Sequence, residues 1–351
     1  MNEGTGLLGV VNLSDLEPLA AARLEPLAFA YYAGGAADEC TLRDNESAWG
    51  RRRFRPRVLV DVSVVDPSTT VLGSAVSLPI GVAPTALHGL GHPDGEPATA
   101  RGAADAGALF TLSTLSSRPM EDLAAVEGPR WFQLYAHRDR GIITDLVARA
   151  AATGHRAIVL TVDLPVLGRR EREVRAGFEW ESGTRFANLA AYGAEEEPVV
   201  DSIASDLTWD DVTWLRGLSD LPVVVKGVLT AEDGVLAVEH GAAGVWVSNH
   251  GGRQLDRTPA TADVLEEVAQ AVAATAEVYV DGGVRRGADA VVALALGATA
   301  VFLGRPVLYA LALGGAAGVT AAFDVVRAEL VNTMALLGVT SVDQIGRAHL
   351  R

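Results

Sequence analysis

Cysteine, lysine and aromatic residues are scarce in this chain of 351 residues. The single cysteine, Cys40, cannot form an internal disulfide and belongs to no cluster of metal ligands, so we expect neither a disulfide framework nor a metal site. Aromatic residues make up only 6% of the chain, whereas hydrophobic residues make up 49%. The core must therefore consist mainly of Ala, Val and Leu.

Positive charge and long apolar runs are also limited. With 29 basic and 44 acidic residues the net charge is −15, which argues against nucleic acid or an anionic membrane as a main partner. The longest apolar runs, such as residues 290–296, are too short to span a bilayer, and the N-terminus lacks the basic stretch of a signal peptide. We therefore expect a soluble cytoplasmic protein.

Apolar runs alternate with Ala-rich stretches of helical spacing from residue 78 onward. Eight strands alternating with helices favour an α/β fold, a closed parallel (β/α)8 TIM barrel, with an open doubly wound sheet as the alternative. The predicted strands lie near residues 80–83, 109–112, 131–134, 157–162, 223–225, 245–247, 278–280 and 300–303.

We expect one domain over residues 1–351, divided into three regions. Residues 1–75 read as an N-terminal helical and irregular segment, and residues 76–351 as the barrel. An insertion after the fourth strand, residues 168–207, is too long for an ordinary βα loop and predicts a lid or a disordered segment. Residues 306–337 are long enough for one or two closing helices.

The stretch G-V-W-V-S-N-H-G-G-R-Q-L-D at residues 244–256 joins a buried strand to a polar loop with two glycines. It delivers His250 and Arg253 together at the carboxyl end of the strand. A histidine can act as a base at neutral pH, and an arginine can bind a carboxylate bidentately. The pair suits chemistry on a small acid, although a lone histidine in such a turn is more often a structural group.

The carboxyl ends of the other strands strengthen the functional interpretation, because in a barrel all of these ends meet on one face. Lys226, the only lysine among 29 basic residues, occupies one of them. Because the chain otherwise uses arginine, the lysine suggests that this position needs a compact ammonium. The alternative is that a lysine occurs here by chance. The strand ends carry Pro84, Thr85, Ser113, Gln133, Tyr135, Thr161, Asp163, Lys226, Ser248, His250, Arg253, Asp281, Gly282, Gly283, Gly304 and Arg305.

Two of these ends predict a phosphate site. D-G-G-V-R-R at residues 281–286 and G-R-P at 304–306 place glycine N–H groups beside arginines, as in many phosphate-binding barrels. A small hydroxy or keto acid carries no phosphate. We therefore expect a phosphate-bearing cofactor beside a separate acid substrate.

These residues resemble the FMN-dependent 2-hydroxy acid oxidases and dehydrogenases, the family of glycolate oxidase, lactate oxidase and mandelate dehydrogenase. The nine-residue motif S-N-H-G-G-R-Q-L-D is highly specific for it, and the similar segments cover almost the whole chain except the insertion. These segments are residues 31–35, 54–57, 83–86, 92–96, 132–135, 161–163, 167–171, 225–227, 248–256, 281–286 and 304–306.

The resemblance implies roles for individual residues. His250 would be the base, Asp163 would hold its imidazole, and Tyr135 would contact the substrate hydroxyl or the nascent carbonyl. Arg170, Arg253 and Tyr31 would bind the substrate carboxylate, and Lys226 would stabilise negative charge on the reduced flavin. The cofactor FMN would be bound by Pro84, Thr85, Ala86, Ser113, Gln133, Thr161, Lys226, Ser248, Asp281, Gly283, Arg285, Gly304 and Arg305.

The substrate prediction depends on Leu115, which stands where glycolate-type members tend to carry a tryptophan. The smaller side chain enlarges an apolar pocket and favours an aryl, mandelate-like or a medium-chain aliphatic (S)-2-hydroxy acid. Tyr31 is retained, as in oxidases of small acids, and therefore favours a smaller substrate. Ala86 resembles the oxidase subgroup, and neither a haem domain nor a membrane insertion is visible, so we expect O2 as acceptor and hydrogen peroxide as product.

Three alternatives remain open from the sequence. They are a 2-hydroxy acid dehydrogenase with another electron acceptor, a flavin barrel acting on a larger biosynthetic intermediate, and a flavin-binding module without catalysis. The resemblance also implies a homo-oligomer, commonly a tetramer.

Overall fold

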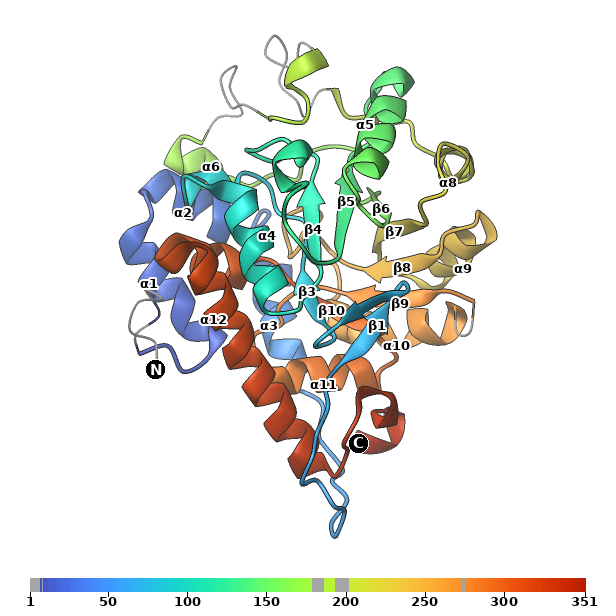
Figure 1. The fold of residues 1–351 in the computed structure, drawn as a ribbon. Coiled ribbons are helices and arrows are strands. Elements are labelled where there is room, and N and C mark those ends of the chain that lie inside the picture. The colour runs from blue at the N-terminus through green and yellow to red at the C-terminus, as the bar shows by residue number, and fades with distance from the viewer. Residues whose placement is uncertain (1–6, 8, 179–185, 193–201, 273–274) are drawn as a thin grey trace.

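Eight parallel strands form a closed barrel, in which β10 pairs with β3 to complete the ring (Figure 1). The computed structural model describes residues 7, 9–178, 186–192, 202–272 and 275–351. Every barrel strand lies at a predicted position, so the closed barrel is confirmed. The strands are β3 (Ile80–Val82), β4 (Phe110–Ser113), β5 (Arg130–Leu134), β6 (Ile158–Thr161), β7 (Val223–Val228), β8 (Gly244–Val247), β9 (Glu277–Val280) and β10 (Ala300–Leu303).

Both faces of the barrel strands are buried, which explains why they read as continuous apolar runs rather than alternating ones. Four of the aromatic residues lie in the barrel interior. Trp131, Trp246, Tyr279 and Phe302 pack there, with 4.0 Å between the ring centroids of Trp246 and Phe302. A small number of large rings therefore fills the interior.

The helices surround the barrel in Figure 1. The N-terminal segment supplies α1 (Leu16–Arg23), α2 (Pro26–Ala33) and α3 (Cys40–Trp49), of which α2 begins with a proline. The other α-helices of the described residues are α4 (Gly95–Asp105), α5 (Arg140–Ala152), α6 (Glu171–Ala176), α8 (Trp209–Arg216), α9 (Ala231–Glu239), α10 (Thr261–Val272), α11 (Gly287–Ala295) and α12 (Arg305–Leu337).

A hairpin of β1 (Thr69–Val71) and β2 (Ser74–Val76) corrects the prediction that residues 1–75 are only helical and irregular. Its turn, Leu72 and Gly73, has positive φ at both positions, which suits a tight hairpin. The N–H of Leu72 donates to the carboxylate of Glu277, the first residue of β9. The hairpin therefore covers the amino-terminal end of the barrel, opposite the strand ends predicted to carry function.

The last helix, α12, is long and apolar enough to cross a membrane by length and composition alone. However, 72% of its most apolar window is buried within the protein, as expected of a core helix. Non-helical dihedral angles at Gly314 and Gly315 divide it into two helical parts. This agrees with the expectation of one or two closing helices.

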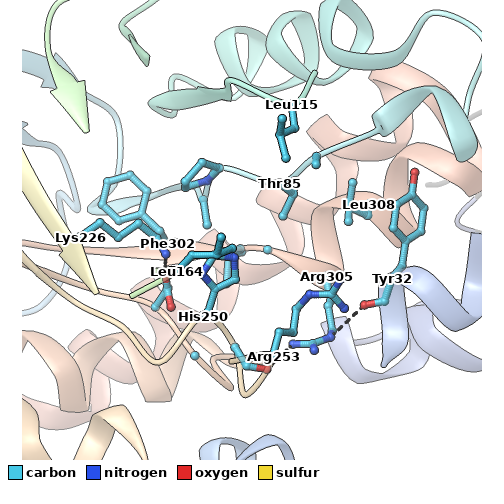
Figure 2. A pocket seen from close by; sticks show the side chains of 18 of the residues that line it. Tyr32, Thr85, Leu115, Leu164, Lys226, His250, Arg253, Phe302, Arg305 and Leu308 are labelled. Carbon is cyan, nitrogen blue, oxygen red and sulfur yellow. Dashed lines mark hydrogen bonds and ion pairs between the residues drawn. The ribbon is translucent and has the colours of Figure 1, made fainter. Parts of the chain in front are cut away.

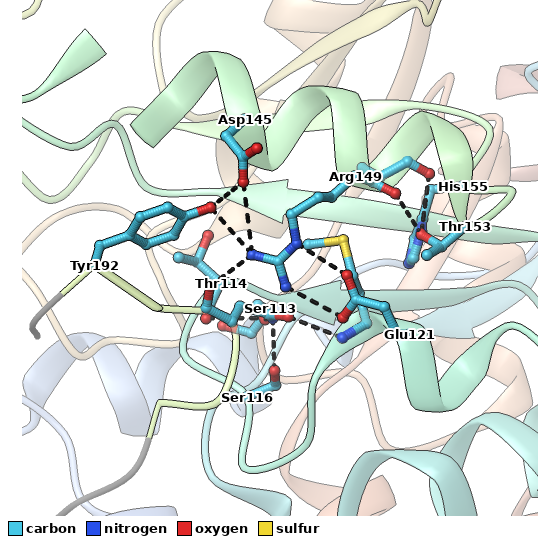
Figure 3. Close-up of polar contacts among 12 residues, drawn as sticks. Ser113, Thr114, Ser116, Glu121, Asp145, Arg149, Thr153, His155 and Tyr192 are labelled. Atoms are coloured by element: carbon cyan, nitrogen blue, oxygen red, sulfur yellow. Dashed lines mark hydrogen bonds and ion pairs between the residues drawn. The ribbon is translucent and has the colours of Figure 1, made fainter. Parts of the chain in front are cut away.

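The insertion between β6 and β7 is described at residues 168–178, 186–192 and 202–207; the rest of the predicted lid lies outside the described residues. Its middle part packs on α5 and on the loop after β4 (Figure 3). Arg149 of α5 donates to the carbonyl of Asn188 at 2.9 Å and to the hydroxyl of Tyr192 at 3.2 Å. The Asn188 amide in turn donates to Ser116 Oγ at 2.7 Å, next to Leu115. This part of the insertion therefore supports the loop that carries Leu115.

Candidate active site

The carboxyl ends of the barrel strands surround a cavity of about 980 Å³ that opens to solvent. Figure 2 shows Lys226, His250 and Phe302 on one side of it and Arg305 with Tyr32 on the other. A concave wall of apolar side chains with a few converging polar groups is typical of a ligand-binding site. The predicted residues in its wall are Tyr31, Pro84, Thr85, Ala86, Leu115, Tyr135, Arg170, Lys226, His250, Arg253, Asp281, Gly283, Arg285, Gly304 and Arg305.

His250 lies between two polar partners. Its Nδ1 is 2.9 Å from Asp163 Oδ1, and its Nε2 is 3.2 Å from the hydroxyl of Tyr135. The backbone N–H of His250 donates to Ser248 Oγ at 3.1 Å, and its φ of 58° is left-handed. Such backbone strain in a residue other than glycine concentrates at functional sites. The imidazole therefore presents Nε2 to the cavity and is oriented through Nδ1.

Burial lowers the pKa of His250 below its ordinary value, although the charge of Asp163 acts against this shift. Burial by itself raises the pKa of Asp163, but the charge of His250 and its hydrogen bond outweigh that effect, and the net shift is downward. At neutral pH the pair is therefore a neutral imidazole beside a carboxylate. Asp163 Oδ2 is buried and accepts no hydrogen bond from any described residue, which favours positive charge on the imidazole when it gains a proton.

Gly227 allows Asp163 to reach this position. Its φ is 114°, and a Cβ there would lie 2.7 Å from the Cβ of Asp163. Any side chain would displace the carboxylate. The V-K-G sequence in the fifth barrel strand, β7, therefore serves two purposes, of which sequence reasoning identified only the lysine.

Two arginines, Arg170, which is buried, and Arg253, which is partly buried, form another part of the site. Arg253 Nη1 donates to the carbonyls of Tyr31 at 2.7 Å and Gly34 at 2.8 Å, and its guanidinium lies 5.0 Å from the centre of the Tyr31 ring. Arg170 Nε donates to the carbonyl of Arg253 at 3.3 Å. Burial, with the charge of Arg253, lowers the pKa of Arg170 to about 10, so Arg170 still carries its charge at neutral pH. A guanidinium pair suits a carboxylate ligand.

Lys226 belongs to a buried polar chain. Its Nζ donates to Ser248 Oγ at 3.0 Å, Ser248 Oγ donates to Asp281 Oδ1 at 2.8 Å, and Lys226 Nζ lies 3.4 Å from Asp281 Oδ2. All three side chains are buried. The ammonium is thereby fixed at the cavity wall rather than free to move on its flexible stem.

Ser113, Gln133 and Thr161 lie at the carboxyl ends of three neighbouring strands. Ser113 Oγ donates to Gln133 Oε1 at 3.1 Å, and Gln133 Nε2 donates to Thr161 Oγ1 at 3.0 Å. These three, together with Asp163 and Ser248, are not among the residues that line the cavity. The structure brings them to the predicted end of the barrel, but behind the cavity wall.

The part of the cavity wall at the N-terminus of α12, next to Arg253, suits an anion. Gly304 is the N-cap of α12 and Arg305 its first residue, so the positive end of the helix dipole faces the cavity. The Arg305 guanidinium is held by the carbonyls of Tyr32, Gly251 and Gly34 at 2.8–3.0 Å. Gly283 is required for close packing, because a Cβ there would lie 2.1 Å from the carbonyl oxygen of Asn45.

These features fit FMN. The helix end and Arg305 suit a phosphate, and the buried ammonium of Lys226 suits a ring that gains negative charge. Arg285, bound to Glu46 at 2.6 Å, adds a further charge at the anion end. Among the described residues, no group of three or more His, Cys, Asp or Glu side chains is arranged to hold a metal ion.

Sequence reasoning missed several apolar wall residues. Leu164 and Leu167 follow Asp163 in the loop after β6, so their position could have indicated them. Ile203 belongs to the insertion and carries no such signal. The missed side chains in the wall are Tyr32, Ala83, Leu164, Leu167, Ile203, Val284, Phe302, Leu303 and Leu308.

A parallel barrel with an oriented histidine, an arginine pair and a phosphate-type helix end defines a class of enzymes that hold a phosphate-bearing cofactor beside a small-acid site. The comparison with known families names the group within that class. The family model described as FMN-dependent dehydrogenase matches residues 20–351, and the chain belongs to this family. Its cofactor is FMN.

Similar proteins include both small-acid and aryl-acid oxidases. Glycolate oxidase 1 of Zea mays is 47% identical over 352 residues, covering 97% of this chain and 95% of that protein. The glycolate oxidase of Spinacia oleracea is 45% identical, with the same coverage. A crystal structure of mandelate oxidase is 43% identical, with a TM-score of 0.91 over 97% of this chain and 98% of that one. The family is therefore clear, and the relatives differ in the acid that they are named for.

Proposed function

We propose that the protein oxidises an (S)-2-hydroxy acid to the 2-keto acid and passes the electrons to O2, giving hydrogen peroxide. The observation that carries this proposal is His250, whose Nε2 faces the cavity while Nδ1 is bound by Asp163, in the same cavity wall as Arg170 and Arg253. A base beside a carboxylate-binding pair suits proton removal from a small acid.

Each protein group has a defined part in this reaction. Arg170 and Arg253 bind the carboxylate, and the hydroxyl of Tyr135, which lies 3.2 Å from His250 Nε2, holds the substrate oxygen. His250 takes up a proton that leaves the substrate, and Asp163 stabilises the imidazolium that forms.

Bound FMN accepts the two electrons that leave the substrate. Lys226, held by Ser248 and Asp281, places a fixed positive charge where the cofactor gains negative charge. The overall reaction is balanced, because two electrons and two protons leave the hydroxy acid and reduce O2 to hydrogen peroxide.

The substrate pocket favours an aryl or medium-chain aliphatic acid. Leu115, Leu164, Leu167 and Ile203 contribute apolar surface to the cavity. A mutant of a mandelate oxidase, 43% identical to this chain, has been solved with (S)-mandelic acid, which supports both the stereochemistry and the aryl class. The glycolate oxidases of similar identity support a smaller acid, so the size of Leu115 becomes the deciding feature.

The test is anaerobic mixing of the FMN-loaded protein with a panel of (S)- and (R)-2-hydroxy acids while flavin absorbance is followed. We expect bleaching with (S)-mandelate and (S)-2-hydroxy acids of medium chain length, and peroxide release once oxygen is admitted. Absence of bleaching with every 2-hydroxy acid would refute the proposed reaction. Bleaching without peroxide after oxygen is admitted would refute the acceptor.

A further inference from the structure

Glu173 of α6 is a buried carboxylate that contacts both arginines of the site. Its Oε1 accepts a hydrogen bond from Arg253 Nη2 at 2.9 Å and lies 3.7 Å from Arg170 Nη1. Glu173 is not among the residues that line the cavity. It therefore acts on a ligand through the two guanidinium groups rather than by contact.

The helix that carries Glu173 is held in place through residues just before it, Arg169 and Arg172. Arg172 forms an ion pair with Glu39 at 2.5 Å, and Glu39 also accepts a hydrogen bond from the N–H of Gly35 at 2.9 Å. The N–H of Ala37 donates to the carbonyl of Arg169 at 2.8 Å. The carboxylate of Glu173 is thus fixed relative to the arginines, and its charge acts from a defined position.

The arginine pair and Glu173 together carry a single positive charge. Arg170 and Arg253 contribute two positive charges, and Glu173 removes one. Glu39 and Arg172 neutralise each other. Arg305 donates to the same Gly34 carbonyl as Arg253, and its charge is the one that suits the phosphate of FMN. One substrate carboxylate completes the balance, whereas a second carboxylate would enter a site with no positive charge left for it and with Asp163 beside His250.

We infer that Glu173 is a specificity-determining and positioning residue that limits the arginine pair to one negative charge, so that the site accepts monocarboxylates and rejects dicarboxylates of the same shape. This inference rests on the proposed function for the identity of the ligand, a 2-hydroxy monocarboxylic acid. It concerns binding and is measurable without turnover.

The test compares two ligands that differ in charge and little in shape, phenylmalonate and its half-amide, by titrating each into FMN-loaded protein and recording the change in flavin absorbance. We expect the wild-type protein to bind the half-amide at least about tenfold more tightly. In Glu173→Gln the affinity ratio should shift toward the diacid by on the order of tenfold, the effect of one unit charge at this range. Glu173→Asp, which keeps the charge, should retain the wild-type ratio while kcat/KM falls.

The matched control is Glu171→Gln, on the same helix. Glu171 pairs with Arg169 and Arg175 at the surface, so its loss should leave the ratio unchanged. A Glu173→Gln ratio equal to that of wild type, or a wild-type protein that binds the diacid as tightly as the half-amide, would overturn the inference. If Glu173→Gln does not retain FMN, the test rests on the affinities of the wild-type protein for the diacid and for the half-amide. If the binding result holds while no hydroxy acid reduces the flavin, only the proposed reaction has failed.

Discussion

Replacing Leu115 by tryptophan tests how the protein selects its substrate. Leu115 is 4% exposed, lines the cavity, and its carbonyl accepts a hydrogen bond from the N–H of Leu87 at 3.2 Å. Its backbone is thus anchored, and a larger side chain has to occupy space within the cavity. We expect Leu115→Trp to fill the volume in which the aryl group of a mandelate-like acid would lie.

The magnitude follows from apolar burial. A phenyl-sized group covers ~100 Å² of apolar surface, which at ~25 cal/mol/Å² stabilises the bound transition state by roughly 2.5 kcal/mol. This corresponds to nearly two decades in kcat/KM if all of it is expressed in the transition state. The wild-type protein should therefore prefer (S)-mandelate to glycolate, and Leu115→Trp should reverse the order.

The assay is steady-state kcat/KM for both acids, with Leu336→Trp as the control because Leu336 is 72% exposed on α12. The control should leave the ratio of the two kcat/KM values unchanged. A wild-type preference for glycolate, or a Leu115→Trp variant that slows both acids equally, would refute the reasoning. The apolar surface of Leu164, Leu167 and Ile203 would then be the next candidate for selecting the acid.

Three further predictions concern the chemistry. His250→Gln should retain FMN, judged by its absorbance, and lose about 10²–10⁴-fold in kcat because the base is removed; a loss below tenfold would contradict that role. Burial lowers the pKa of His250, and the base acts in its neutral form. We therefore expect kcat/KM to be constant from pH 8 to pH 7 and to fall only below about pH 6.5, the ordinary pKa of histidine. An acid-side inflection above pH 7 would show that the pKa is raised instead. The Lys226→Arg variant keeps the charge, but an arginine cannot occupy the same compact position beside Ser248 and Asp281. Flavin reduction should therefore slow, and sulfite addition to the flavin should weaken. Unchanged rates in stopped-flow measurements would mean that any cation suffices at position 226.

Several expectations from the sequence stay predictions. They are the single-domain organisation, the cytoplasmic location, the tetramer, and the individual roles of the site residues. The structure agrees with the roles to the extent that it brings the predicted side chains to one end of one barrel.

The sequence by itself determined the barrel and the location of the site, because both depend on local patterns. Continuous apolar runs such as I-V-L-T at 158–161 identify strands covered on both faces. Once the strands are parallel, the residue after each run must lie at the same end of the barrel. His250, Asp163 and Lys226 could therefore be placed together without coordinates.

Only the tertiary structure decided which of these side chains touch and which charges balance. Glu173 contacts Arg253, 80 residues further along the chain, and Arg253 donates to the carbonyl of Tyr31, 222 residues before it. The β1–β2 hairpin was missed because its short strands gain their burial from the barrel interior rather than from their own pattern. Contacts between distant segments depend on how helices and loops pack, and packing depends on the volume and charge of every neighbour, which no local pattern contains.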